Sequence, residues 1–232
     1  MNYKADFHNH SCLSPCAGIE MGPITLVNRA KNLGIKILGL TDHNSARNTP
    51  AFEYLAKESG ILPLCGVEVT TSEEIHVLCF FPTSGEALDF GNLIEKALPR
   101  IPLNHEKMGE QWVVNKDEEI LEEVDFYLGT ATSYGIDQVE KLCHDLGGLF
   151  IPAHIDRPTS SLKSQLGYIP QLNYDGFEIQ LSPEGLNTGI TPLVKGSDAH
   201  HPDMVGQRTC EIDLPQLSWE ALVAYFQSFS RV

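Results

Sequence analysis

The first residues of the chain have the types and spacing of metal ligands. Asp6, His8 and His10 occupy alternate positions, so in an extended strand their side chains project from one face. Imidazole and carboxylate groups are common ligands of divalent transition metals. An acid and a histidine two residues apart return near the other end of the chain, as Asp198 and His200. The pattern predicts a metal site assembled from distant parts of the sequence.

Further candidate ligands stand at or beside short apolar runs. Glu68 lies within the mostly apolar run 61–69, where burial of a carboxylate is costly unless a cation pairs with it. A bound metal explains that acid most simply. The other candidates in such positions are His43 in Thr41-Asp42-His43, His76, and His154 in Pro152-Ala153-His154.

The elements that must position these residues alternate between helix and strand. An apolar stripe predicts a helix over 23–33, closed by Gly34 and followed by a strand over 35–40. The same plan predicts helices over 51–59, 136–146 and 219–229, and strands over 61–69, 75–81, 149–154, 177–181 and 193–196. Such alternation favours an α/β barrel with a parallel sheet and with chemistry at the carboxyl ends of the strands.

One segment fits this plan poorly. Residues 82–132 contain Pro99, Pro102 and acidic stretches, and we interpret them as an inserted helical lobe within a single domain covering 1–232. The lobe either covers the site and selects substrates or is a solvated surface excursion.

Composition narrows the classes of partner. The chain has 232 residues, 16 basic against 31 acidic, and a formal net charge of −15, which repels polyanions and argues against a long nucleic acid as partner. No apolar stretch approaches the roughly 18 residues of a membrane span, and the ligand pattern begins too early for a signal peptide. We therefore expect a cytoplasmic protein without a membrane partner, whose six cysteines are mostly buried, reduced thiols. The oligomeric state is left open.

The ordered set of motifs resembles the PHP (polymerase and histidinol phosphatase) family of metal-dependent phosphoesterases, over nearly the whole chain. The resemblance implies a distorted (β/α)7 TIM-like barrel that holds two or three divalent ions, which the donor types allow to be Zn, Mn or Fe. By position, it makes His8, His10, Glu68 and Asp198 ligands of one metal. Glu68 would bridge to a second metal bound by His76 and His154, and a third would take His43 and His200.

Cys16 marks a departure from the family pattern. Some members place another histidine of the third site where this chain has Cys16. A thiolate ligand at that position would favour zinc or ferrous iron over manganese. The alternative is a small buried thiol with no ligand role.

The resemblance implies hydrolysis of a phosphate ester by a hydroxide that bridges the metals. Asp42 is a candidate for orienting a water that protonates the leaving group, although it could instead bond a ligand imidazole, which is our interpretation of Asp6. Arg157 follows His154 by three residues and could fork onto a substrate phosphate or form a surface salt bridge.

The favoured function is a phosphoesterase acting on a small phosphorylated substrate, namely a nucleotide such as a 3′,5′-bisphosphate or a short oligonucleotide. Histidinol phosphate is a rival substrate. A metal-dependent amidohydrolase and a non-catalytic metal- or nucleotide-binding module are the alternative functions.

Overall fold

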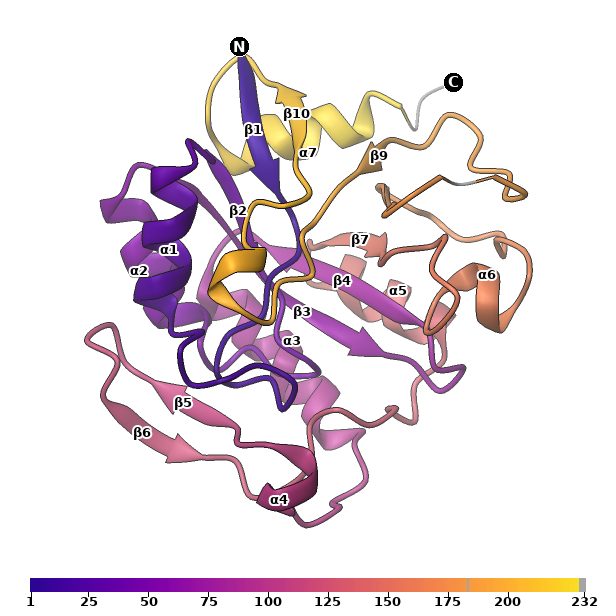
Figure 1. Cartoon of the computed structure of the whole chain (residues 1–232). Helices are drawn as coiled ribbons and strands as arrows, with labels where there is room; N and C mark the ends of the chain where they lie inside the picture. The colour runs from indigo at the N-terminus through magenta and orange to yellow at the C-terminus, as the bar shows by residue number, and fades with distance from the viewer. Residues whose placement is uncertain (183, 230–232) are drawn as a thin grey trace.

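The structure is a computed structural model that describes residues 1–182 and 184–229 (Figure 1). Its centre is a six-stranded sheet that curls into half a barrel, so the α/β fold agrees with the predicted distorted TIM-like barrel. In spatial order the strands are β10 (Cys210–Asp213), β1 (Asn2–Asp6), β2 (Ile37–Leu40), β3 (Leu62–Thr70), β4 (His76–Phe81) and β7 (Leu149–Pro152).

The sheet is mixed, which corrects the expectation of a parallel one. Strands β1, β2 and β3 are parallel and are connected through helices α1 (Pro23–Asn32) and α2 (Thr49–Glu58). Strand β4 runs antiparallel to both β3 and β7. Its direction follows from the short link 71–75, because a parallel crossover needs a dozen or more residues. Since Thr70 pairs with His76, the start of β4 lies at the same edge as the end of β3.

The remaining elements pack around this half-barrel sheet. The two-residue strands β8 (Phe177–Glu178) and β9 (Leu193–Val194) form a separate parallel pair. The helical elements after the insert are α5 (Ile136–Asp145), α6 (Leu162–Gln165), the 3₁₀ helix η1 (Pro202–Met204) and α7 (Trp219–Gln227). Helix α7 contributes Leu222 and Phe226 to the buried cluster on the inner face of the sheet.

Alternation along the strands separates two buried faces. On β4, Val77 and Cys79 belong to the core beneath the outer helices, whereas Leu78 and Phe80 belong to the inner cluster. His76 shares the inner face with these last two residues. On β3, Leu64 fills the inner face below Glu68. The apolar residues therefore fill the interior of the half-barrel, and polar side chains lie at the edge where β1, β2 and β3 end.

The segment 82–132 is only in part the helical lobe that we expected, because it also contains a β-hairpin. Helix α3 (Ser84–Lys96) packs Phe90 and Ile94 into the main core. The rest of the segment holds the one-turn helix α4 (His105–Met108) and a hairpin formed by β5 (Trp112–Val114) and β6 (Ile120–Glu123). The acidic residues that suggested a solvated helix instead fall in the turn and exposed strand of this hairpin, while a small apolar cluster anchors it to the loop after β1.

The cysteines match a further expectation. All six cysteines are free thiols, and four of them are buried. Cys210 is half-buried, and Cys16 is exposed. Within the described part of the chain, each helix is too short or too polar to cross a bilayer.

Candidate metal centre

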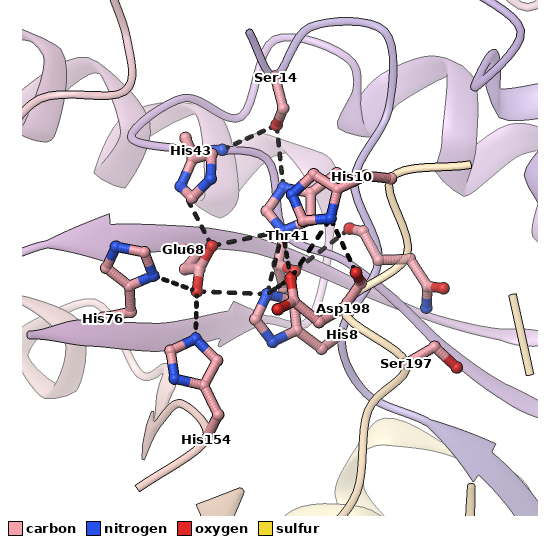
Figure 2. Close-up of polar contacts among 12 residues, drawn as sticks. His8, His10, Ser14, Thr41, His43, Glu68, His76, His154, Ser197 and Asp198 are labelled. Atoms are coloured by element: carbon pink, nitrogen blue, oxygen red, sulfur yellow. Dashed lines mark hydrogen bonds and ion pairs between the residues drawn. The ribbon is translucent and has the colours of Figure 1, made fainter. Parts of the chain in front are cut away.

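Segments that are far apart in the sequence bring their side chains together at one point, at the edge of the sheet where β1, β2 and β3 end (Figure 2). Glu68 lies on β3 and His76 begins β4, while His43 follows β2. The other ligand candidates follow strand ends, with His8 and His10 after β1, His154 after β7, and Asp198 and His200 after β9. The structure thus brings together every predicted histidine and acid ligand.

Glu68 is the centre of this cluster. Its side chain is only 1% exposed, and five imidazole nitrogens surround its carboxylate. The distances are 2.8 Å to His76 Nδ1, 3.1 Å to His43 Nδ1, 3.2 Å to His154 Nε2, and 3.3 Å to His8 Nε2 and to His10 Nε2. Burial by itself raises the pKa of Glu68, but the rings of His76, His8 and His43 hold it well below its usual range. The group is therefore an anion at neutral pH.

Asp198 supplies a second buried carboxylate beside the same rings. Its Oδ1 lies 3.2 Å from His10 Nε2 and 3.4 Å from His8 Nε2. Burial opposes ionisation, but His8 and His10 hold the pKa of Asp198 far below its ordinary value. His200 lies beside it, with its Nδ1 2.8 Å from the Asp198 carbonyl oxygen.

The donor atoms fit divalent cations. Three groups place all of their donor atoms within 4.8 Å of one another: His8, His10, Glu68 and Asp198; His43, Glu68 and His76; and His10, Cys16, His43 and His200. These groups resemble the three predicted sites with two differences, because His43 stands in place of His154 in the second group and His10 joins the third. His43 Nδ1 and Glu68 Oε2 are buried and lie 3.1 Å apart, yet neither has a hydrogen-bond partner among the described residues, as expected of two atoms that share another ligand.

The protonation states also favour a cation. Burial lowers the pKa of His10 to about 4, so its ring is neutral, which is the form that binds a metal. At His8 burial also lowers the pKa, yet the carboxylates of Glu178, Glu68 and Asp198 raise it well above its usual range. The buried acids therefore require a positive charge at this point, and a divalent ion can supply it.

Comparison with known proteins identifies the family. The model of the PHP domain matches residues 6–229. The chain belongs to the PHP domain family. A Haemophilus influenzae 5′-3′ exoribonuclease is 38% identical over 81 residues, which are 34% of this chain and 28% of that protein. An uncharacterized Bacillus subtilis protein, YqxK, is 26% identical in an alignment of 218 residues that covers 81% of this chain and 50% of that protein. The chain thus spans half or less of the length of these relatives.

Solved structures share the fold of this PHP domain. The lesion-specific endonuclease Q of Pyrococcus furiosus has a TM-score of 0.69 at 18% identity, covering 98% of this chain and 56% of that one. A second structure of endonuclease Q holds a 27-mer duplex with an abasic lesion at the active site. A candidate metal-dependent phosphoesterase from Bifidobacterium adolescentis has a TM-score of 0.56 at 18% identity, covering 85% and 88% of the two chains. An amidohydrolase from Chromobacterium violaceum has a TM-score of 0.55 at 20% identity, covering 95% and 96%.

One residue that supports the PHP centre was missed by the sequence reasoning. Glu178 on β8 is fully buried, and its Oε2 lies 2.9 Å from His8 Nδ1 and accepts a 2.8 Å hydrogen bond from the His154 backbone N–H. A carboxylate on the far nitrogen of a ligand imidazole fixes the orientation and tautomer of that ring. The signal was available, because Glu178 is a lone acid in a predicted strand, as Glu68 is.

Asp42 and Asp6 hold backbone and hydroxyl groups rather than imidazoles. Asp42 accepts hydrogen bonds from the Ser11 backbone N–H and hydroxyl, at 2.7 and 2.6 Å, and from the Ser14 hydroxyl at 2.7 Å. Ser14 Oγ in turn lies 3.0 Å from His10 Nδ1 (Figure 2), so Asp42 reaches that ring through Ser14. Asp6 accepts from the Ser197 backbone N–H and hydroxyl, at 2.8 and 2.6 Å. The interpretation of Asp6 as a direct partner of an imidazole was therefore wrong.

Backbone strain coincides with the centre. His154 and Asp198 have φ values of 30° and 51°, which non-glycine residues rarely adopt. The strained bend after each strand turns the side chain inward, and such strain gathers at functional sites.

Arg157 forms a 2.8 Å ion pair with Asp198 Oδ2 and is 37% exposed, at the rim of the centre. The three histidines outside the motifs pair with acids elsewhere, namely His105 with Glu123, His144 with Glu140 and Asp175, and His201 with Asp203.

Proposed function

We propose that this PHP domain is a metal-dependent phosphoesterase that hydrolyses a small phosphorylated substrate. The favoured substrate is a nucleotide, either a 3′,5′-bisphosphate or a short oligonucleotide. The observation that carries the proposal is the buried Glu68 carboxylate with its five surrounding imidazoles, which form adjacent groups of donors for two or three divalent ions. Ions in such an arrangement lower the pKa of bound water and neutralise the charge of a phosphate ester.

The residues around the donors have separate tasks in this proposal. Arg157 is partly exposed beside Asp198, so its guanidinium can exchange that carboxylate for a substrate phosphate, with which it forms paired hydrogen bonds. Asp42 acts through Ser14 to hold His10 in place. Direct protonation of the leaving group by Asp42 is not favoured, because Ser11 and Ser14 already occupy its buried oxygens.

The comparisons bear on the substrate. The exoribonuclease relative and endonuclease Q both act on nucleic acid by their names, which supports a nucleotide over histidinol phosphate. One structure of endonuclease Q contains a duplex. The argument from net charge, which excluded a long nucleic acid as a partner, is therefore not supported. A duplex therefore belongs in the assay beside the small substrates.

The decisive experiment measures hydrolysis by protein loaded with manganese or zinc. The panel contains nucleoside monophosphates, 3′,5′-bisphosphates, histidinol phosphate, short oligonucleotides and a duplex with an abasic site. We expect phosphate or nucleotide release that is lost in His154→Ala and kept in His144→Ala, a matched histidine that pairs with Glu140 and Asp175 away from the centre. Ammonia from amide substrates would instead establish the amidohydrolase, and silence of the metal-loaded protein would favour a non-catalytic binding module.

The third metal site is tested separately through Cys16. Its thiol lies within 4.8 Å of donor atoms of His10, His43 and His200, and we propose that it ligates as a thiolate, which selects zinc or ferrous iron over manganese. Cobalt in this site should give a sulfur-to-metal charge-transfer band. We expect the band to vanish in Cys16→Ser and to persist in Cys12→Ser, since Cys12 is buried and lies against Asn48 and the Trp112 carbonyl instead. Absence of the band from the wild-type protein would overturn this assignment.

A further inference from the structure

A pocket of about 280 Å³ opens beside the metal centre. His76 belongs to both, because it lines the pocket and its Nδ1 lies 2.8 Å from Glu68 Oε1. The other residues that line the pocket are Thr70, Glu74, Gly129, Thr130, Ala131 and Ser160. The volume is just below the roughly 300 Å³ at which pockets for drug-sized ligands begin, so it suits a group the size of a sugar.

Hydrogen bonds hold the walls of this pocket in place. Asn44 donates to the carbonyl oxygens of Leu128 and Thr130, at 2.6 and 2.9 Å, and accepts at 2.9 Å from the backbone N–H of Thr70. It thereby ties the end of the segment 82–132 to the end of β3. On the opposite side, the His76 backbone N–H donates to the Ser160 carbonyl at 3.1 Å. The pocket is therefore preformed.

Two independent observations indicate that the pocket receives a ligand. Thr70 is 7% exposed, and its Oγ1 is a buried oxygen without a hydrogen-bond partner among the described residues. Buried hydroxyls are normally satisfied, so this oxygen awaits a polar group. Glu74 and Ser160 have φ values of 61° and 52°, and strained non-glycine residues gather at ligand sites.

The lining selects the chemistry of that ligand. Apart from His76, whose ring is engaged with Glu68, none of the described residues that line the pocket is aromatic, lysine or arginine. The pocket therefore offers little stacking surface for a base and no lysine or arginine for a second phosphate. It offers three hydroxyls and one carboxylate, and a carboxylate is the group that accepts from a ribose 2′-hydroxyl in dinucleotide sites. We propose that this pocket binds the ribose of a ribonucleotide whose phosphate lies at the metal centre, and that Glu74 recognises the 2′-hydroxyl. This inference rests on the proposed function.

The test compares adenosine 5′-monophosphate with its 2′-deoxy analogue, and a short oligoadenylate with its deoxy counterpart. The wild-type protein should favour the ribose form in kcat/KM by about 10- to 100-fold, the value of one hydrogen bond to a charged group. Glu74→Gly should reduce this ratio to about one, and glycine accepts the positive φ at this position. Glu118→Gly is the matched control, because Glu118 has a φ of 60° in the β5–β6 turn, and it should keep the ratio.

Failure of this inference differs from failure of the proposed function. Equal turnover of ribose and deoxyribose forms, or a preference that survives in Glu74→Gly, would overturn the ribose pocket and leave the phosphoesterase standing. Absence of all turnover would overturn the phosphoesterase. In that case, saturation-transfer NMR of the two nucleotides on wild-type protein still tests the pocket, and equal binding of both would refute it.

Discussion

Glu178 offers the sharpest test of how the metal centre is supported. We consider Glu178→Gln, which keeps the shape of the buried side chain but removes its charge. The Glu178 carboxylate holds His8 through the ring nitrogen that faces away from the centre, and it also holds the backbone of His154. Loss of the charge should leave both ligands less firmly oriented, so we expect weaker metal binding without loss of the fold.

The magnitude follows from the two contacts of one oxygen. A hydrogen bond to a charged group contributes about 1.5–3 kcal/mol, and a neutral one about 0.5–1.5 kcal/mol. The difference of about 1 kcal/mol per bond, over two bonds, gives about 2 kcal/mol, or about 30-fold in metal affinity. This value lies within the 10- to 100-fold range found for partners of metal-binding histidines.

The assay is a zinc titration against a chelator of known affinity, performed on wild-type protein and on Glu178→Gln. Glu140→Gln is the matched control, because the Glu140 carboxylate lies 3.0 Å from His144 Nδ1 in a pair remote from the centre. We expect the control to bind zinc as the wild type does. An unchanged zinc affinity in Glu178→Gln, with the protein folded, would refute the view that this carboxylate orients the ligands.

Two further predictions concern stability. Asn44→Gly keeps a backbone that has a φ of 52° and removes three hydrogen bonds. At about 0.5–1.5 kcal/mol for each bond, the free energy of unfolding in urea should fall by about 1.5–4.5 kcal/mol. An unchanged value would mean that these bonds do not hold the pocket wall. The hydrogen bond to Asp175, aided by Glu140 and opposed by partial burial, raises the pKa of His144. The ion pairs therefore stabilise the fold fully below the unfolded pKa of about 6.5, and this contribution is lost as the pH rises through the higher folded pKa. Because the His144 ring is partly exposed, its contribution to the free energy of unfolding is at most about 1 kcal/mol. Urea titrations at several pH values should show this contribution in the wild-type protein. The same pH dependence in His144→Gln would mean that it does not come from His144.

The residues that gather at the centre could be predicted from the sequence, because most of them carry a local signal. Glu68 is an acid inside an apolar strand, and His154 follows an apolar run that ends in a strained bend. In an α/β barrel, the ends of such strands meet at one edge, so local signals predicted a shared site. Cys16 became a candidate only through the resemblance to the PHP family, because its position corresponds to a histidine in some members.

Other features depended on contacts between distant segments. Local sequence patterns say little about which distant segments come into contact. The direction of β4 is set by its pairing with β3 and β7, and only that direction brings His76 to the edge where Glu68 stands. The insert was misread because charge and proline content do not distinguish an exposed helix from an exposed hairpin, whose identity depends on the apolar cluster beneath it.

The sequence by itself determined the types of ligand, the class of fold and the strand ends at which the ligands lie, because burial and periodicity act over a few neighbouring residues. Tertiary structure alone decided which groups support those ligands. Glu178 lies 170 residues from His8 in the chain, and Asn44 joins β3 to a segment more than 80 residues away. A hydrogen bond requires two groups within about 3 Å, and only the folded chain fixes which distant groups come that close.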